Sequence, residues 1–329
     1  MKKVLITGAN GFLGSHLVER GLKIGMEVHA AVRKTSDLSN LSECTPIIKY
    51  IDFDKEDNLR TLLQREKYDY IIHAAGLTKA IDKESYYKVN SGYTRKLIKL
   101  LHEENVLPTK FIFISSLASY GPADFQPEGI VSNQSIPHPV SEYGKSKLQA
   151  EQFVQGFHAL NYIIFRPSII YGPREKELLL LYKNINRGFE LYIGDKEQNL
   201  SFIYIDDLVR IIYKSLDSKA AKTSYFASDG KKYSSEYYNS LIKGVLGKKT
   251  YKFVLPMKLV RFAAGISEKY SNFLKHPTMF NIDKLNELTS KSWECDITPL
   301  VEDLGFSPKF FLKKGIVETI KWNIENRNL

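Results

Sequence analysis

The residues with the clearest chemical potential are a tyrosine and a lysine in the segment YGKSK, Tyr143 and Lys147. Residues four positions apart lie on the same face of a helix. An ammonium group beside a phenol stabilises the phenolate and lowers the phenol pKa from its usual value of about 10. Such a tyrosine can exchange a proton with a substrate hydroxyl while hydride moves to or from a nicotinamide. Ser116, at the end of an expected strand, can hydrogen-bond the same oxygen, so we predict that Ser116, Tyr143 and Lys147 are catalytic.

A glycine-rich segment, TGANGFLG, occupies positions 7–14 between an expected strand and an expected helix. Its first glycine permits a tight turn, its second lets the backbone approach a pyrophosphate, and its third lets the helix pack closely on the strand. The free N–H groups and the dipole of the helix N-terminus favour an anion there. We therefore predict dinucleotide binding, with contacts from Gly8, Asn10, Gly11, Phe12, Leu13 and Gly14.

The residue that reads the adenosine ribose is expected about 20 positions after this loop. Arg33 stands there and Lys34 follows it. An acid at this position would select NAD, whereas an arginine suits a 2′-phosphate. The sequence therefore favours NADP(H), with NAD as the alternative cofactor. Asp52 and Phe53, which end the third expected strand, are predicted to flank the adenine.

The first half of the chain alternates apolar strands with helices. The helices are expected at Phe12–Gly25, Ser85–Asn105 and Glu142–Leu160, and the strands at Lys3–Thr7, Glu27–Arg33, Pro46–Ile51, Tyr70–His73, Lys110–Ser115 and Tyr162–Arg166. Nearly continuous apolar strands separated by helices indicate a parallel sheet covered on both faces. The crossovers should be right-handed. The fold class is therefore α/β, a doubly wound parallel sheet of the Rossmann type.

The pattern loosens after Tyr171. Helices are expected at Leu178–Gly188, Leu259–Tyr270 and Lys313–Glu325, and a short strand at Phe202–Ile205 precedes a helix starting near Asp206. We predict a dinucleotide-binding domain over residues 1–170 and mainly a smaller substrate-binding lobe over 171–329, with 200–228 returning to the first domain. Ligands in this architecture bind at the carboxyl ends of the strands. The segment Leu255–Leu274 is basic and partly amphipathic, and a core-facing helix is favoured over a membrane-surface or lid role.

Composition narrows the function classes. With 329 residues, 43% hydrophobic and 26% charged, the chain resembles an ordinary globular protein and is neither disordered nor collagen-like. Two cysteines exclude a disulfide scaffold, and no metal site is expected because no Cys or His cluster has zinc spacing. The net charge of +10 is scattered, so no nucleic-acid partner is predicted. The apolar run at the N-terminus is too short for a secretion signal, and no apolar run is long enough to span a membrane, so a cytoplasmic location is expected.

Several motifs together resemble one known family. They are TGANGFLG, HAAG at His73–Gly76, Asn90 in KVNSGYT, SSLASYG at Ser115–Gly121, YGKSK, FRPSIIYGP at Phe165–Pro173 and FIYIDDL at Phe202–Leu208. Over nearly its whole length the chain resembles an extended short-chain dehydrogenase/reductase of the NAD-dependent epimerase/dehydratase type. The resemblance implies that Tyr143 is the acid/base, that Lys147 lowers its pKa and binds the nicotinamide ribose, and that Ser116 positions the reacting oxygen.

The resemblance also implies further contacts. The residues expected to line the cofactor are Ala74, Ala75, Gly76, Asn90, Tyr143, Lys147, Pro167 and Ile169, and those expected near the substrate are Thr78, Leu117, Ile170 and Arg174. Dimerisation through the helices at Ser85–Asn105 and Glu142–Leu160 is common in such proteins.

Two branches of the family remain open. Nucleotide-sugar epimerases usually have an arginine just before the strand that matches FIYIDDL, where this chain has Asn199-Leu200-Ser201, and often an asparagine where it has Ser168-Ile169-Ile170. Arg174 could still supply a phosphate contact. Arg33 and the apolar Ile169-Ile170 favour reductases similar to dihydroflavonol reductase or 3β-hydroxysteroid dehydrogenase. We expect a net NADP(H)-dependent reductase or dehydrogenase of a secondary alcohol or ketone. The alternative is a nucleotide-sugar epimerase or dehydratase that recycles its cofactor, and a protein that has lost catalysis is disfavoured.

Overall fold

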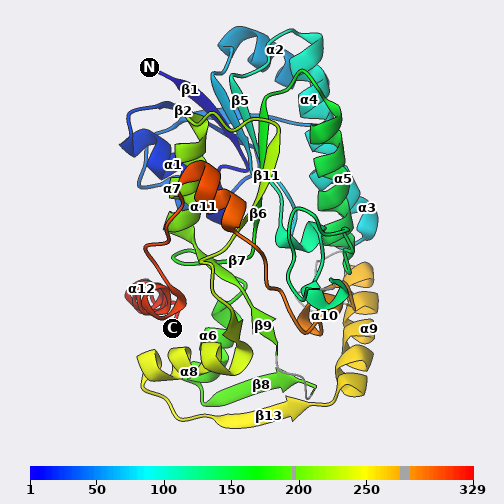
Figure 1. Cartoon of the computed structure of the whole chain (residues 1–329), viewed down its shortest axis with the longest axis vertical. Helices are drawn as coiled ribbons and strands as arrows, with labels where there is room; N and C mark the ends of the chain where they lie inside the picture. The colour runs from blue at the N-terminus through cyan, green and yellow to red at the C-terminus, as the bar shows by residue number, and fades with distance from the viewer. Residues whose placement is uncertain (127, 195–197, 275–281) are drawn as a thin grey trace.

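The structure is a computed structural model that describes residues 1–126, 128–194, 198–274 and 282–329. Its centre is a 7-stranded sheet with the strand order β11-β6-β5-β4-β1-β2-β3 (Figure 1). Every neighbouring pair in it is parallel. The strands are β1 (Lys3–Thr7), β2 (Glu27–Val32), β3 (Ile47–Tyr50), β4 (Tyr70–His73), β5 (Lys110–Ile114), β6 (Tyr162–Pro167) and β11 (Thr223–Ala227).

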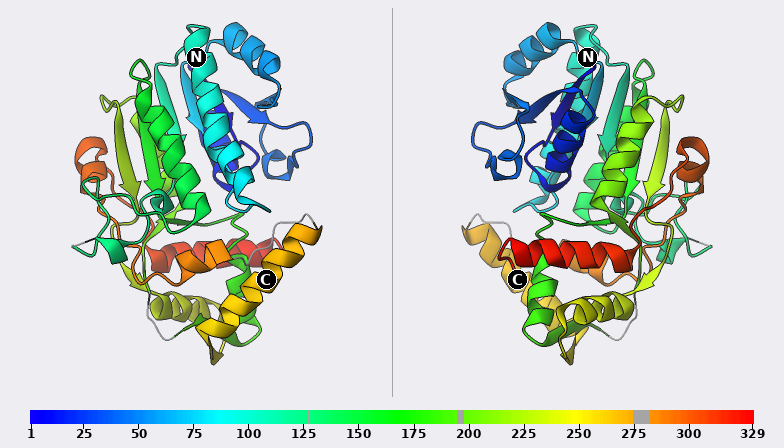
Figure 2. Two further views of the ribbon diagram at one scale, coloured as in Figure 1. Left: turned by 90° about the vertical axis from the view of Figure 1, so that its right-hand side faces the viewer. Right: turned by 90° about the vertical axis from the view of Figure 1, so that its left-hand side faces the viewer.

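Helices cover both faces of this sheet, because successive strand residues point to opposite sides. In β1, Val4 and Ile6 join the core on the side of α1 (Phe12–Lys23) and α7 (Ile205–Leu216). Leu5 joins the core on the other side, with α2 (Glu56–Glu66), α4 (Tyr93–Glu103) and α5 (Glu142–Gly156). Figure 2 shows α4 and α5 on one face and α1 and α7 on the other. The predicted doubly wound parallel sheet is confirmed.

The boundaries of two predicted helices differ from the expectation. The segment expected as one helix over Ser85–Asn105 comprises α3 (Lys83–Tyr86), a π-helical segment η2 (Tyr87–Gly92) and then α4. Extra residues of this kind inside a helix often mark a functional site. The helix expected to reach Leu160 ends at Gly156, because Phe157 leaves the helical region with φ −90° and ψ 85°. The helix α2 was not predicted.

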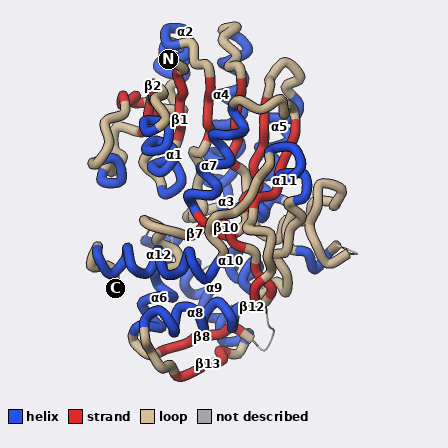
Figure 3. The backbone as a smooth tube through the Cα atoms, turned by 60° about the vertical axis from the view of Figure 1, so that its left-hand side comes forward, coloured by secondary structure: helices blue, strands red, loops and turns tan. Residues whose placement is uncertain are grey.

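The chain then builds a second lobe beyond the carboxyl ends of the strands (Figure 3). Its short strands are β7 (Ile169–Tyr171), β8 (Phe189–Ile193), β9 (Asn199–Leu200), β10 (Phe202–Tyr204), β12 (Tyr233–Ser234) and β13 (Tyr251–Leu255). Its helices are α6 (Leu179–Asn186), α8 (Ser235–Leu246), α9 (Met257–Leu274), α10 (Ile282–Leu288) and α12 (Leu312–Glu325). The strand expected through Ile205 ends at Tyr204, and α7 begins one residue earlier than expected. Within the described ranges, no helix combines the length and the apolarity needed to cross a bilayer.

Residues 205–227 contribute to the central layer. The hydroxyl of Tyr213 in α7 donates to the carbonyl oxygen of Leu17 in α1 at 2.6 Å, which joins the two helices on their shared face. The chain then enters the sheet as β11, whose Phe226 pairs with Arg166 of β6. The helix α11 (Thr298–Leu304) packs beside β11 at this edge of the sheet, where the Tyr225 hydroxyl of β11 donates to Asp303 of α11 at 2.8 Å.

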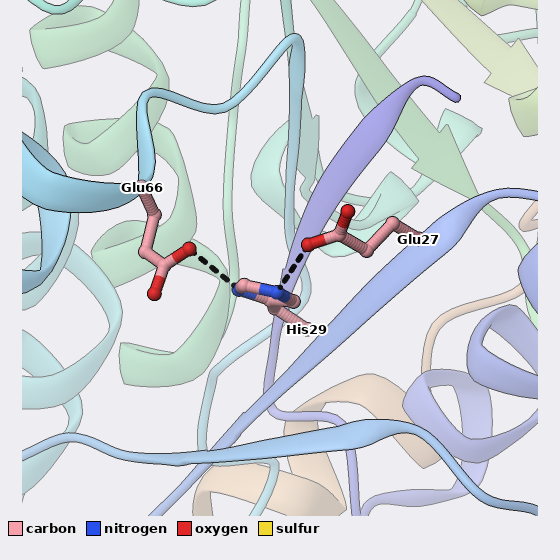
Figure 4. A group of neighbouring side chains, drawn as sticks. All are labelled: Glu27, His29 and Glu66. Carbon is pink, nitrogen blue, oxygen red and sulfur yellow. Dashed lines mark hydrogen bonds and ion pairs between the residues drawn. The ribbon is translucent and has the colours of Figure 1, made fainter.

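An ion-pair cluster stabilises the amino-end edge of the sheet (Figure 4). Nε2 of His29 lies 2.9 Å from a Glu27 oxygen, and Glu66 lies on the other side of the ring. These three side chains have the proximity of metal ligands. However, Lys49 and Lys3 already bind Glu66 at 2.8 and 3.0 Å, and Lys49 is the main cause that lowers the Glu66 pKa to about 2. The lysines supply the positive charge, so the cluster is an ion-pair link between β1, β2, β3 and α2.

Candidate active site

The glycine loop lies directly against the end of β4. Gly8 has φ +68°, a conformation that favours glycine. A Cβ on Gly8 would lie 2.8 Å from both the Ala74 carbonyl oxygen and the Ala75 nitrogen. The loop and the predicted cofactor residues after β4 are therefore neighbours, and Gly8 is required by both its φ and its surroundings.

The N-terminus of α1 has no side-chain cap. Gly11 precedes the helix, no described side chain caps its first N–H groups, and its first turn contains no acidic residue. Its N–H groups and its dipole thus suit an anion. Asn10 binds the segment after β2 instead. Its side-chain Nδ2 donates to the Asp37 carbonyl oxygen at 3.1 Å, and its backbone carbonyl oxygen accepts from the Asn40 side chain at 3.0 Å.

The residues expected around the adenosine differ in their exposure. Arg33 is exposed at the end of β2, and its backbone N–H donates to Ser36 Oγ at 3.1 Å. Asp52 is exposed, whereas Phe53 is buried and its ring stacks on Tyr93 with 4.7 Å between ring centroids. The Phe53 ring is therefore engaged in packing, and its contact with adenine stays a prediction.

Three predicted residues from three segments meet below the end of β4. Asn90, in η2, is fully buried; its Nδ2 donates to the Leu77 carbonyl at 3.1 Å and to Ser146 Oγ at 2.9 Å. A Cβ on Gly76 would lie 3.1 Å from both Asn90 Oδ1 and Lys147 Nζ. Gly76, Asn90 and Lys147 thus form one compact group.

Lys147 is a buried cation with a single described hydrogen bond. Lys147 is only 4% exposed, and its Nζ donates to the carbonyl oxygen of Ile114, at the end of β5, at 2.8 Å. Burial lowers the Lys147 pKa to about 8, and the nearby Glu151 carboxylate opposes that shift. Lys147 therefore remains mostly protonated at pH 7.

Glu151 belongs to a buried network that the sequence analysis missed. One of its oxygens accepts from Nε and Nη2 of Arg166 at 2.9 and 2.7 Å, and the other accepts from Ser119 at 2.7 Å and from Ser115. Arg166 also donates to Asn133 at 3.0 Å. Helical spacing offered a signal, because Glu151 lies four residues after Lys147 and eight after Tyr143 on the same face of α5.

The Ser116 side chain acts on the Tyr143 phenol, and the Tyr143 pKa moves opposite to the expectation. Burial raises the Tyr143 pKa well above its usual value, and the Ser116 side chain only partly offsets this shift. A phenolate loses its hydration on burial, and the Lys147 ammonium donates to the Ile114 carbonyl. The lowering of the Tyr143 pKa by Lys147 stays a prediction.

The helix α10 of the second lobe covers the start of α5, which no sequence signal indicated. The carboxylate of Asp283 accepts from the backbone N–H groups of Glu142 at 2.6 Å and Tyr143 at 3.4 Å. Ser141 donates to Glu287 at 2.6 Å, and Lys284 binds the other Glu287 oxygen at 3.0 Å. The charges of Glu287 and Lys284 both act on the Tyr143 phenol. A segment about 140 residues away in the sequence thus holds the catalytic candidate in position.

The segment after β6 reaches the same region. Pro167 pairs with Ala227, and Ile169 and Ile170 pair with β10 and are half-buried. Between them, Ser168 Oγ is buried with no hydrogen-bond partner among the described residues. A buried hydroxyl without a partner, beside the predicted nicotinamide position, fits a site in which a polar group of the ligand would hydrogen-bond this hydroxyl.

The predicted substrate residues are more scattered. Thr78 is exposed and donates to Glu177 at 2.9 Å, and Leu117 is buried. The Arg174 guanidinium lies against α1, where it donates to Ser15 Oγ at 3.0 Å and pairs with Glu19 at 2.7 Å. The Arg174 guanidinium is thus engaged with the first turns of α1.

The fold and this site define a dinucleotide-binding α/β protein with a serine, a tyrosine and a lysine at the carboxyl end of the sheet. Residues 4–227 match the NAD dependent epimerase/dehydratase family. The chain belongs to that family, as its motifs predicted, and the family's members are enzymes.

Similar proteins cover nearly the whole chain. UDP-glucose 4-epimerase of Vibrio cholerae is 28% identical over 99% of this chain and 97% of its own length. Ceramide reductase of Caulobacter vibrioides is 25% identical over 97% of this chain and 93% of its own. The structure of UDP-glucuronic acid 4-epimerase from Bacillus cereus, in complex with NAD, has a TM-score of 0.78 and 25% identity, covering 99% of this chain and all of that one (100%).

Proposed function

We propose that the chain transfers hydride between a nicotinamide dinucleotide and a secondary alcohol or ketone, with Tyr143 as the acid/base. The observation that carries this proposal is that the Ser116 side chain acts on the Tyr143 phenol, while the buried Lys147 ammonium lies one turn along the same helix, α5. These groups lie at the carboxyl end of β5, and Lys147 Nζ lies close to Gly76 of the cofactor segment. The proposed proton donor, the proposed ligand of the reacting oxygen and the proposed dinucleotide contacts would therefore share one edge of the sheet.

The residues present fit a dinucleotide. The backbone of Gly8–Gly14 and the uncapped start of α1 would hold the pyrophosphate, and the segment Ala74–Gly76 would line it. Asn90, Lys147, Pro167 and Ile169 would surround the nicotinamide ribose and ring. When bound, the dinucleotide supplies or accepts the hydride.

The protonation state of Tyr143 suggests the direction of its proton transfer. Because the Tyr143 pKa is raised, the phenol is protonated at neutral pH and can donate its proton to a carbonyl oxygen that becomes an alcohol. Ser116 would donate to the same oxygen and fix its place. The Lys147 ammonium would stabilise negative charge on the phenol oxygen once that proton has left.

We further propose a preference for NADP(H), with a 2′-phosphate on Arg33. The exposure of Arg33 at the end of β2 supports this, since a guanidinium binds phosphate with paired hydrogen bonds. Thr78, Leu117 and Ile170 are the proposed substrate contacts. Arg174, beside α1, remains a candidate for a phosphate group.

A second candidate is an epimerase or dehydratase of a nucleotide-activated sugar. Its support is the similarity to UDP-glucose 4-epimerase over 99% of the chain. In that reaction type Tyr143 would remove a hydroxyl proton and return it later, and the cofactor would leave each turnover unchanged.

The bound cofactor separates the two candidates. The protein would be purified without added cofactor and denatured, and any released dinucleotide identified by chromatography and mass. Stoichiometric NAD would support the epimerase or dehydratase and reject Arg33 as a phosphate ligand. An empty protein that binds NADPH better than NADH would support the net reductase, and ketones and aldehydes would be screened next.

The assembly proposed for this enzyme is a homodimer through α4 and α5. These helices lie side by side on one face of the sheet, where Arg95 packs on the Phe153 ring at 5.3 Å (Figure 2). A mass twice that of the chain in light scattering supports the dimer, and the mass of one chain rejects it. The proposed location is the cytoplasm.

A further inference from the structure

The two-stranded ribbon of β8 and β13 presents an apolar face to the outside. The two strands are parallel, with Phe189 beside Tyr251 and Leu191 beside Phe253. Paired residues of neighbouring strands share a face of a sheet. The next pair on this face, Ile193 and Leu255, is also apolar.

The opposite face of the ribbon carries Glu190, Tyr192, Lys252 and Val254. Glu190 is buried there and binds Lys243 of α8 at 2.8 Å. Lys252 pairs with Glu236, at the start of α8. The usual arrangement, with apolar residues inside and polar residues outside, is therefore inverted at the start of β8, where Glu190 is buried and Phe189 and Leu191 are exposed.

The apolar side chains of the outer face are well exposed. Tyr251 is 77% exposed, and Phe189, Leu191 and Phe253 are each more than 40% exposed. At the start of α9, which follows β13 in the chain, Leu259 and Phe262 are likewise 64% and 70% exposed. We call these six residues the tip face, since the ribbon lies at the end of the molecule opposite α2 (Figures 1 and 3).

The expected core-facing role of the segment Leu255–Leu274 holds for one side of its first turns, where Val260 and Ala264 pack with Leu285. Leu259 and Phe262 point away from that cluster and are exposed. Several large exposed apolar side chains at one end of a protein are typical of an interaction site.

The charges around the tip face indicate its partner. Residues 248–265 contain five lysines and arginines and no acidic residue. Lys248, Lys249, Lys258 and Arg261 are all exposed. A second copy of the same face would bring these cations against one another, so self-association is opposed by charge. Aromatic residues interspersed with lysine and arginine instead suit an anionic lipid surface.

We propose that the tip face binds the surface of an anionic lipid bilayer. The side chains of Tyr251, Phe253 and Phe262 enter the boundary between headgroups and acyl chains, and the four cations contact lipid phosphates. The protein attaches to the membrane from one side, through side chains of the second lobe. This proposal is independent of the reaction at Tyr143.

Vesicle sedimentation tests this proposal. The whole protein is mixed with phosphatidylcholine vesicles, with or without about one-quarter phosphatidylglycerol, at low and high salt. We expect binding to the anionic vesicles only, with a loss at high salt because lipid charges are screened. No binding to anionic vesicles overturns the proposal.

Matched variants locate the surface. Tyr251→Ser with Phe253→Ser removes apolar contacts, and Lys248→Gln with Lys249→Gln removes charge; each pair should weaken binding about 10-fold or more. The controls are Phe125→Ser, another exposed aromatic residue, and Lys219→Gln with Lys222→Gln, at the far end of the sheet.

The outcomes are distinguishable. The assignment of this surface is overturned if both double variants of the tip face bind anionic vesicles as the wild type does, or if the control variants lose binding equally. The lysine pair keeps the test valid if the serine pair fails to fold, which thermal unfolding would show. A dimer in light scattering that Phe253→Ser dissociates, without vesicle binding by the wild type, would mean that a second copy covers the face.

Discussion

Arg166 and Glu151 form an ion pair in the core, with 2.7 Å between Nη2 and Oε2 and with both side chains at most 2% exposed. The pair connects β6 to α5, one helical turn beyond Lys147. It also supplies the negative charge that opposes the loss of the Lys147 proton. Structural support for α5 and electrostatic support for the site therefore come from the same carboxylate.

Breaking this pair should be costly. Arg166→Met leaves a buried carboxylate without its partner, and we expect a loss of about 3–5 kcal/mol in the free energy of unfolding. Urea denaturation measures it. The double variant Arg166→Met with Glu151→Leu should recover much of that loss, because no charge is then left unpaired. A single variant as stable as the wild type would contradict the assigned role.

Removing the proton donor should abolish most turnover while the fold persists. Tyr143→Phe keeps the ring but lacks the hydroxyl, so turnover should fall at least about 100-fold. The assay is the change in nicotinamide absorbance with a substrate found in the screen. Dinucleotide affinity should change little, and near wild-type turnover would overturn the mechanism.

The Lys147 pKa predicts a pH-dependent stability. Burial lowers the pKa from 10.5 to about 8, so the native state binds this proton less tightly than the unfolded chain does. The Lys147 contribution is therefore fully present above pH 10.5 and is lost as the pH falls toward 8.

The comparison with Lys147→Met isolates this effect. Between these pH values the stability of the wild type should rise relative to the variant, by at most about 1.4 kcal/mol per unit of pH. Urea denaturation of both proteins across the window measures the difference, and tyrosines that titrate there cancel between them. A difference that is constant with pH would refute the lowered pKa.

Arg33→Ala should weaken NADPH binding selectively. Losing charge-assisted hydrogen bonds to a 2′-phosphate costs about 1.5–3 kcal/mol, or roughly 10- to 100-fold in affinity. NADH lacks that phosphate, so its affinity should stay the same. Isothermal titration measures both, with the exposed Lys23→Ala as the control for net charge. Equal effects on the two cofactors would exclude the phosphate contact.

Asp283→Ala should lower turnover more than another variant that loses the same free energy of unfolding. The variant removes the acceptor for the N–H groups of Glu142 and Tyr143, which costs about 1 kcal/mol for a helix cap. Asp296→Ala is the matched control, because its carboxylate accepts from the Thr298 N–H at 2.9 Å, at the start of α11. If both variants lose stability equally and turnover falls only in Asp283→Ala, α10 positions Tyr143. Equal turnover in both would reject that role.

Local sequence patterns determined the architecture. Apolar strands such as β1 and β5 form a buried parallel sheet wherever helices separate them, and the spacing of Gly8, Gly11 and Gly14 shapes the loop between β1 and α1. The four-residue separation of Tyr143 and Lys147 places them on one helical face. These properties depend on periodicity and on backbone geometry within a few residues, so they can be read without the fold.

Only the tertiary structure decided the environment of those residues. Burial raises the Tyr143 pKa, Arg166 reaches Glu151 from another strand, and Asp283 caps α5 from the second lobe. The outward face of β8 and β13 likewise depends on which side of the ribbon α8 covers. Desolvation, ion pairing and exposure arise from contacts between distant segments, which residue spacing along the chain does not encode.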